Sequence, residues 1–106
     1  MILKTGRLPA REFHSRGYRT MATPFFSLKI KPNELGQKRV GVVVGASVHK
    51  LAARRNFFKR QAKETIRGIA GKGNDFLLIV SPKANTLTRK QFREMVTQAA
   101  VRSGNI

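Results

Sequence analysis

The sequence predicts an α+β protein in which helices pack on a small β-sheet. Three segments carry this prediction. Residues 23–31 alternate between apolar and polar side chains, residues 75–81 form a nearly continuous apolar run, and residues 48–69 repeat apolar side chains at helical spacing. With a further strand and a last helix, the order along the chain is strand, strand, long helix, strand, helix.

The two strands before the long helix are expected to pair. Phe26, Leu28 and Ile30 share one face of the first strand, and the valine-rich segment 39–45 forms the second. Between them, the Pro-Asn-Glu-Leu-Gly segment at 32–36 has the composition of a turn. We therefore expect an antiparallel pair joined by a loop of about six residues.

The remaining elements end at recognisable breakers. Gly68 and the Gly-Lys-Gly segment at 71–73 stop the long helix. The apolar run after it predicts a central strand that is covered on both faces and ended by Pro82. Thr88 is a suitable N-cap for a last helix over residues 89–102. The apolar face of that helix carries Phe92, Met95, Val96 and Ala99.

The N-terminal part of the chain is basic and weakly patterned. Breakers such as Pro9 and Gly17 leave room only for a short helix around residues 11–14. We therefore expect a basic arm over residues 1–22 and a single domain over residues 23–104.

The charge of the chain points to a polyanionic partner. It holds 22 Lys and Arg against 5 Asp and Glu, a formal net charge of +17. Like charges at this density repel one another in a folded chain, so nucleic acid is the first interpretation and an anionic membrane surface the second. No apolar run reaches the roughly 20 residues of a membrane span. We expect a cytoplasmic protein, with an arginine-containing transit peptide as the alternative for the N-terminus.

The sequence offers no catalytic constellation. It has no cysteine, which excludes disulfides and thiolate metal sites, and His14 and His49 lie far apart. A two-metal nuclease needs clustered carboxylates, and none of the five acidic residues pair at a useful spacing. We therefore expect no catalytic residue, no directly ligated metal and no small-molecule substrate.

The long helix is unusually basic. Between positions 50 and 67 it carries seven basic residues: Lys50, Arg54, Arg55, Lys59, Arg60, Lys63 and Arg67. At about 100° per residue, an apolar stripe faces the core and a polar flank adjoins it. The predicted stripe is Leu51, Phe58, Ala62, Ile66 and Ile69, and the flank is Asn56, Lys59, Arg60, Lys63 and Arg67. Arg55 borders the stripe, and Lys50 and Arg54 lie toward the outward side.

This flank favours phosphate binding. Neighbouring like charges on a helix repel by some tenths of a kcal/mol per pair, and only Glu64 compensates locally. Because phosphate contacts release counterions, affinity should fall steeply with salt. The alternative is an ordinary solvated helix face. Asn56 is a mediocre helix former, so it is expected to bond RNA, a metal-bound water or a nearby loop.

The run Arg55-Asn56-x-x-Lys59-Arg60-x-x-Lys63-Glu64 resembles the signature helix of the bacterial ribonuclease P protein subunit. The valine-rich strand precedes the helix as in that family. Gly17 ahead of the Phe25-Phe26 strand, and the Ser-Pro-Lys-Ala-x-x-Leu-Thr segment at 81–88, also resemble the family. The resemblance covers about residues 11–103.

The resemblance implies an α/β sandwich with a left-handed crossover, and a partner RNA that is itself the catalyst. In that family the RNA removes 5′ leaders from precursor tRNA with Mg²⁺, and the protein binds both the ribonuclease P RNA and the leader. Mg²⁺ would be held mainly by the RNA. Carried over, the predicted RNA contacts are Arg55, Asn56, Lys59, Arg60 and Lys63, with Lys50, Arg54 and Arg67 beside them.

Some positions depart from the family or admit two interpretations. Phe57 stands where the family has its second motif arginine, and either stacks on a base or packs on the N-terminal arm. Phe13 resembles the leader-contacting aromatic, with a spacing to Gly17 one residue longer than usual. Phe26 and Leu28 resemble the wall of the leader cleft, with ordinary core packing as the alternative.

Composition alone does not separate this interpretation from a structural RNA-binding protein of ribosomal type. The signature helix and its context favour ribonuclease P. A membrane-surface protein is less favoured because the helix is not a clean two-faced amphipath. Sequence-specific DNA binding is less favoured because no helix-turn-helix spacing is visible.

Overall fold

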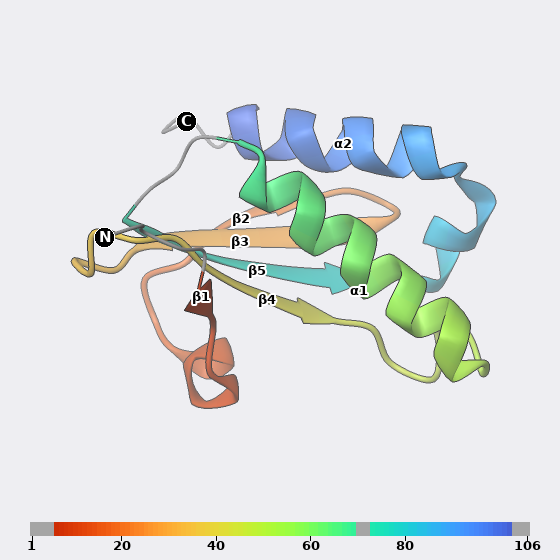
Figure 1. Cartoon of the computed structure of the whole chain (residues 1–106), viewed down its shortest axis with the longest axis horizontal. Helices are drawn as coiled ribbons and strands as arrows, with labels where there is room; N and C mark the ends of the chain where they lie inside the picture. The colour runs from red at the N-terminus through yellow and green to blue at the C-terminus, as the bar shows by residue number, and fades with distance from the viewer. Residues whose placement is uncertain (1–5, 70–72, 103–106) are drawn as a thin grey trace.

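The computed structural model of the chain describes residues 6–69 and 73–102. Within these ranges, two helices cover one face of a five-stranded mixed sheet with the strand order β1-β4-β5-β3-β2 (Figure 1). The elements are β1 (Gly6–Arg7), the 3₁₀ helix η1 (Ala10–His14), β2 (Arg19–Ala22), β3 (Phe26–Pro32), β4 (Arg39–Val43), α1 (Ala52–Arg67), β5 (Asn74–Val80), the 3₁₀ helix η2 (Pro82–Thr86) and α2 (Arg89–Arg102). The α+β class that the sequence predicts is confirmed.

The two strands predicted before the long helix are β3 and β4. The prediction that they pair as an antiparallel hairpin is wrong, because β5 lies between them. Leu78 of β5 is paired with Leu28 on antiparallel β3 and with Val42 on parallel β4. The uninterrupted apolar run of β5 explains this position, since a central strand has both backbone edges hydrogen-bonded and both faces covered. The prediction of a central third strand is confirmed.

The connection from β4 through α1 to β5 has an unusual hand. In Figure 1 both strands point the same way, α1 lies in front of them, and β5 lies above β4. This is a left-handed crossover, whereas about 98% of such connections are right-handed. The hand agrees with the resemblance and could not be predicted from the periodicity of the sequence.

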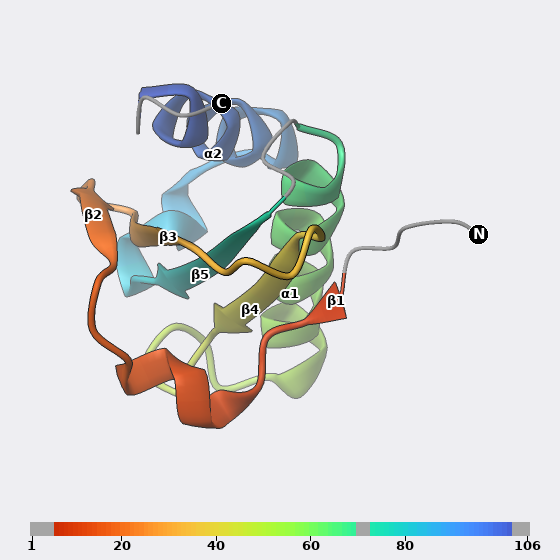
Figure 2. The same ribbon diagram turned by 90° about the vertical axis from the view of Figure 1, so that its left-hand side faces the viewer.

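The segment expected as a basic arm supplies both edges of the sheet. β1 pairs parallel with β4 and β2 pairs antiparallel with β3. Between them η1 forms the short helix expected around residues 11–14, and it lies on the side of the sheet opposite to α1 and α2 (Figure 2). Residues 1–5 of the predicted arm and residues 103–104 of the predicted domain lie outside the described residues.

The helix predicted at residues 48–69 begins four residues later, at Ala52. The carbonyl groups of residues 48–50 accept hydrogen bonds from the side chains of Asn85 and Arg55, which satisfies them outside the helix. Leu51, expected in the core stripe, precedes the first turn and is 61% exposed.

The C-terminal end of α1 is closed by a buried lysine. Gly68 follows the last helical residue, as predicted; of the other predicted stop residues, 71 and 72 lie outside the described part of the chain. The ammonium group of Lys38 donates to the carbonyl oxygen of Ile66 at 2.7 Å and also to that of Ile69. Burial lowers the pKa of Lys38. The lysine adds donors to carbonyls at the end of the helix, where the Ile66 oxygen also accepts from the Ile69 N–H at 3.3 Å.

α2 has the bounds that the sequence predicts. The Thr88 hydroxyl accepts from the Gln91 N–H at 3.1 Å, and the Gln91 side chain accepts from the Thr88 N–H at 2.9 Å. This reciprocal pair is a capping box, which satisfies two donors at the start of the helix.

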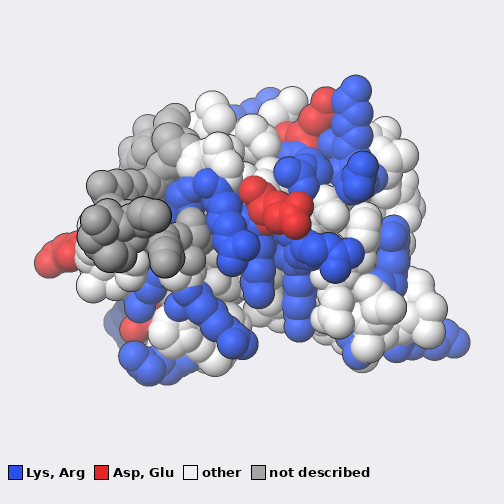
Figure 3. Space-filling view, in the orientation of Figure 1, with Lys and Arg blue, Asp and Glu red and all other residues white. Residues whose placement is uncertain are grey.

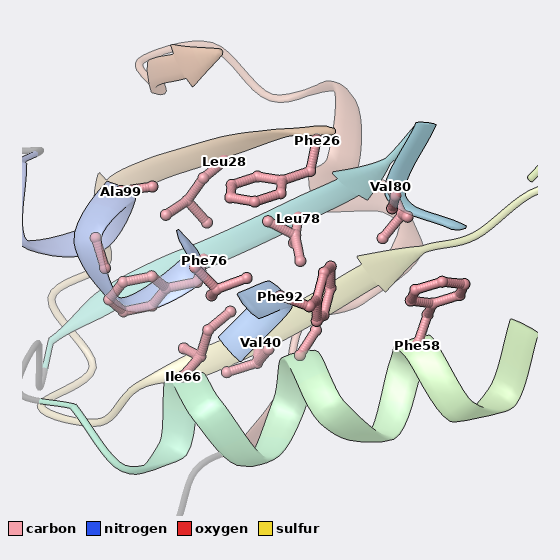
Figure 4. Close-up of a cluster of buried hydrophobic side chains, with 14 of the residues drawn as sticks. Phe26, Leu28, Val40, Phe58, Ile66, Phe76, Leu78, Val80, Phe92 and Ala99 are labelled. Atoms are coloured by element: carbon pink, nitrogen blue, oxygen red, sulfur yellow. The ribbon is translucent and has the colours of Figure 1, made fainter. Parts of the chain in front are cut away.

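The hydrophobic core lies between the helices and one face of the sheet (Figure 4). The Phe92 ring of α2 meets Phe26 of β3 edge-on at 6.1 Å between centroids and Phe58 of α1 at 5.4 Å. These three rings are almost fully buried and connect both helices to the sheet.

Candidate RNA interface

The polar flank of α1 forms a continuous basic surface. A shallow cavity of about 270 Å³ lies along this flank. Its lining residues are Asn56, Lys59, Arg60, Lys63, Glu64 and Arg67. Figure 3 shows basic side chains gathered over α1 around a central acidic group, and Glu64 is the acidic residue of the cavity lining. We call Asn56, Lys59, Arg60, Lys63 and Arg67 the lysine flank.

The charges on the lysine flank are crowded. Partial burial lowers the pKa of Lys63, and the positive charges of Arg7, Arg67 and Lys59 lower it further. A phosphate placed here would relieve this repulsion, because an anion stabilises the charged form of the lysine. Arg7 enters the surface from β1, and the sequence carries no periodic signal for a strand of two residues.

The other predicted RNA contacts near the start of α1 lie apart from this flank. The Arg55 guanidinium donates to the carbonyl oxygens of His49 at 2.8 Å and Lys50 at 3.0 Å. Arg55 therefore holds the loop before the helix. The guanidinium of Arg54 lies over the Phe57 ring, which packs against the hydrophobic core.

Phe26 and Leu28 are corrected from leader-contact candidates to core residues. Both have an exposed fraction of 0% and point toward the helices, as Figure 4 shows. A fully buried side chain offers no surface to a nucleotide. Their alternating neighbours on β3 face the opposite side of the sheet.

We call the side of the sheet away from α1 and α2 the open face. It is formed by the other alternation of strand residues: Ser27, Lys29, Lys31, Gly41, Val43 and Ile79. Phe13 of η1 lies directly on this face, because a Cβ atom added to Gly41 would be 2.8 Å from its ring. Phe13, Lys29 and Ile79 are each half-buried. The alternation of β3 could have pointed to Lys29 once its apolar face was assigned to the core.

A cluster of polar side chains ties the N-terminal segment to the open face. The ammonium group of Lys31 lies 5.0 Å from the Tyr18 ring centroid and 3.5 Å from the Glu12 carboxylate. The Tyr18 hydroxyl donates to the Glu12 carbonyl oxygen at 2.8 Å. These contacts hold η1 over the sheet and leave an aromatic ring and a cation on the same face.

Metal-ligating side chains do not cluster within the described residues. Over residues 6–69 and 73–102 there is no group of three or more His, Cys, Asp or Glu side chains that could hold a metal ion. Asp75 is fully buried and both of its carboxylate oxygens bond Arg39 at 2.8 Å. In the same part of the chain, no helix has the length and apolar character needed to cross a membrane.

The fold and the lysine flank define a basic α+β protein whose surface suits an RNA partner. Comparisons with known proteins name the family. The family model described as Ribonuclease P matches residues 11–103. The chain is 38% identical over 96 residues to the ribonuclease P protein component of Chromobacterium violaceum, covering 91% of this chain and 76% of the relative. It is 32% identical over 100 residues to that of Pseudanabaena sp., covering 90% and 85%. The chain belongs to the ribonuclease P protein family.

Solved structures agree on the fold. The ribonuclease P protein of Staphylococcus aureus superposes with a TM-score of 0.82 at 20% identity, over 95% of this chain and 97% of that one. The protein from Thermotoga maritima gives 0.68 at 23% identity, over 87% and 96%.

Proposed function

We propose that this chain is the RNA-binding subunit of a ribonuclease P holoenzyme in the cytoplasm, and that it assists removal of the 5′ leader from precursor tRNA. The observation that carries the proposal is the lysine flank, where Lys59, Lys63 and Arg67 meet Arg7 on one surface within a member of this family. The partner bound there is the ribonuclease P RNA.

The open face is the proposed contact for the 5′ leader. Single-stranded nucleic acid is bound by a basic groove with aromatic or apolar surfaces on which bases stack. Phe13, Tyr18 and Ile79 supply partly exposed apolar surface, and Lys29 and Lys31 supply charge on the same side of the sheet. This assignment replaces Phe26 and Leu28 and keeps Phe13.

The chemistry of cleavage belongs to the RNA subunit in this proposal. Phosphodiester hydrolysis with Mg²⁺ needs ligands for the ions, and the described residues offer no such cluster. The chain contributes by holding the RNA and the substrate, and by neutralising phosphate charge so that the RNA can hold its ions at a lower Mg²⁺ concentration.

The test is cleavage of a 5′-extended precursor tRNA by a bacterial ribonuclease P RNA at low Mg²⁺, with the RNA alone, the protein alone and both together. Stimulation only with both present supports the proposal. If the protein does not stimulate cleavage but binds other structured RNA tightly, the ribosomal-type alternative replaces it. Cleavage by the protein alone would overturn the assignment of chemistry to the RNA.

A further inference from the structure

The flank of α1 that faces α2 carries a guanidinium close to two aromatic rings. The guanidinium carbon of Arg54 lies 4.7 Å from the Phe57 ring centroid and 4.8 Å from that of Phe58. The two rings meet edge-on at 5.8 Å. Arg54 and Phe57 are both half-buried, so part of this stack remains at the surface. Leu51, three residues before Arg54 and 61% exposed, adds apolar surface at the same end of α1.

α2 places further cations at the same end of the molecule. The side chain of Arg93 donates to Gln61 of α1 at 2.8 Å and to Glu64 at 3.3 Å. One turn earlier, Arg89 and Lys90 are exposed and line, with Arg93 and the acidic Glu94, an open cavity of about 600 Å³. Both helices begin at this end (Figure 1).

We call Arg54, Phe57, Arg89, Lys90 and Arg93 the arginine surface. It differs from the lysine flank in that a guanidinium lies over aromatic rings, whereas Arg60 and Arg67 line a cavity without an aromatic residue. A guanidinium is planar, weakly hydrated and able to stack, unlike a compact, strongly hydrated ammonium group. A guanidinium over an aromatic ring therefore suits the flat face of a base rather than a phosphate alone. Bases in a duplex are already stacked, so only unpaired nucleotides can use such a platform.

We propose that the arginine surface is a second RNA contact, which binds an unpaired segment of the partner RNA with a base stacked at Arg54 and Phe57. This inference rests on the proposed RNA-binding function, but it concerns a different flank of α1. Arg89, Lys90 and Arg93 neutralise the phosphates next to the stacked base.

The first test is Arg54→Lys, which keeps the charge and removes the planar group. Affinity for the ribonuclease P RNA is measured over a series of salt concentrations. The variant should bind about tenfold more weakly with an unchanged salt slope, because the planar guanidinium is removed from the stacking platform while the phosphates stay neutralised. Arg102→Lys in the last turn of α2 makes the same exchange at an exposed arginine outside both surfaces, so it is the matched control and should bind within about twofold of the parent. An affinity for Arg54→Lys equal to that of the control would overturn the inference.

A second measurement locates the RNA. Since the chain has no cysteine, Glu94→Cys places a single thiol at the cavity beside Arg89 and Arg93, and Leu35→Cys places one on the distant β3–β4 loop. Each thiol carries an azidophenacyl crosslinker. Crosslinks from position 94 to unpaired nucleotides support the inference. Crosslinks only to paired nucleotides, or none above the position 35 control, contradict it.

The same binding series separates this inference from the proposed function. The double variant Lys59→Ala/Lys63→Ala should bind the RNA more weakly, and its salt slope should fall by about one unit for each phosphate that the protein no longer neutralises. If the double variant weakens binding and Arg54→Lys does not, only the arginine surface is wrong. If neither changes the affinity, the proposed function itself fails. Circular dichroism melting curves confirm that each variant is folded.

Discussion

The two faces of the sheet are built from the same strands, but one face is buried under the helices and the other is partly exposed. On the helix-covered face, alternate residues such as Phe26, Leu28 and Leu78 are fully buried under α1 and α2. On the open face, their neighbours Ser27 and Lys29 stay half-buried, and η1 is the described helix that lies over the sheet. Since strand side chains alternate with a period of two, one register decides both faces. Substitutions of the buried residues of β3 should therefore lower stability, whereas substitutions of their neighbours on the open face should weaken leader binding.

The largest effect on this comparison is expected from Phe26→Ala. Removing a buried ring that contacts Phe92 leaves a cavity and should lower the free energy of unfolding by about 3–5 kcal/mol. Urea denaturation followed by circular dichroism measures the decrease. Lys29→Ala on the same strand is the control, with an expected change within about 0.5 kcal/mol. A small decrease for Phe26→Ala would mean that the ring is not a core residue.

The next effect concerns a buried charge at the start of β5. Asp75 is fully buried and bonds Arg39 through two contacts and Asn33 through a third, each at 2.8 Å. Asp75→Asn replaces the anionic partner of Arg39 with a neutral amide that can accept only one of the two hydrogen bonds, and should cost about 3 kcal/mol in unfolding free energy.

The exposed pair of Arg93 and Glu64 provides the matched control for this measurement. Its side chains are 39% and 49% exposed, so Glu64→Gln should cost no more than about 1 kcal/mol. Similar decreases in stability for Asp75→Asn and Glu64→Gln in the same denaturation experiment would contradict the distinction between buried and exposed pairs.

The two faces also differ in how far the sequence could predict them. The helix-covered face follows from periodicity, because apolar residues recur at strand and helix spacing; α2 and the central place of β5 were predicted in this way. The open face depends on segments without periodicity, such as β1 and η1, which reach the sheet through long-range pairing. The hairpin prediction failed for a related reason, since local turn composition does not show that a distant strand inserts between β3 and β4.

The candidate site also contains residues whose positions the sequence could predict and residues whose positions it could not. The positions of Lys59, Lys63 and Arg67 on one flank follow from the helical repeat. The contribution of Arg7 could not be predicted, because it depends on the pairing of β1 with β4. The hydrogen bond from Arg55 to the preceding loop also could not be predicted, because it depends on where the helix begins.

Gly41→Ala tests the open face itself. The added methyl group would lie 2.8 Å from the Phe13 ring and 3.2 Å from Leu8, so η1 must shift. Overpacking of this kind costs about 1–3 kcal/mol. If Phe13 stacks on the leader, the ratio of the holoenzyme's affinities for precursor and mature tRNA should fall about tenfold, while affinity for the ribonuclease P RNA stays the same. An unchanged ratio would remove Phe13 from the leader contact.

The smallest effect is expected from Lys29→Ala, which changes charge on the open face without changing its shape. Lys29 faces the same side of β3 as Ser27 and lies outside the hydrophobic core, so the fold should be unaffected. Removing one phosphate contact should reduce the salt slope of precursor tRNA binding by about 0.7 units, the value for a single strand, and leave the slope for mature tRNA as it was. Binding is measured in the assembled holoenzyme at several salt concentrations. Lys83→Ala on η2 removes an equal charge away from the open face and should alter neither slope. If Lys29→Ala and Lys83→Ala change the salt slopes for precursor and mature tRNA alike, Lys29 acts only through the net charge of the protein. The open face would then not be a specific contact for the leader.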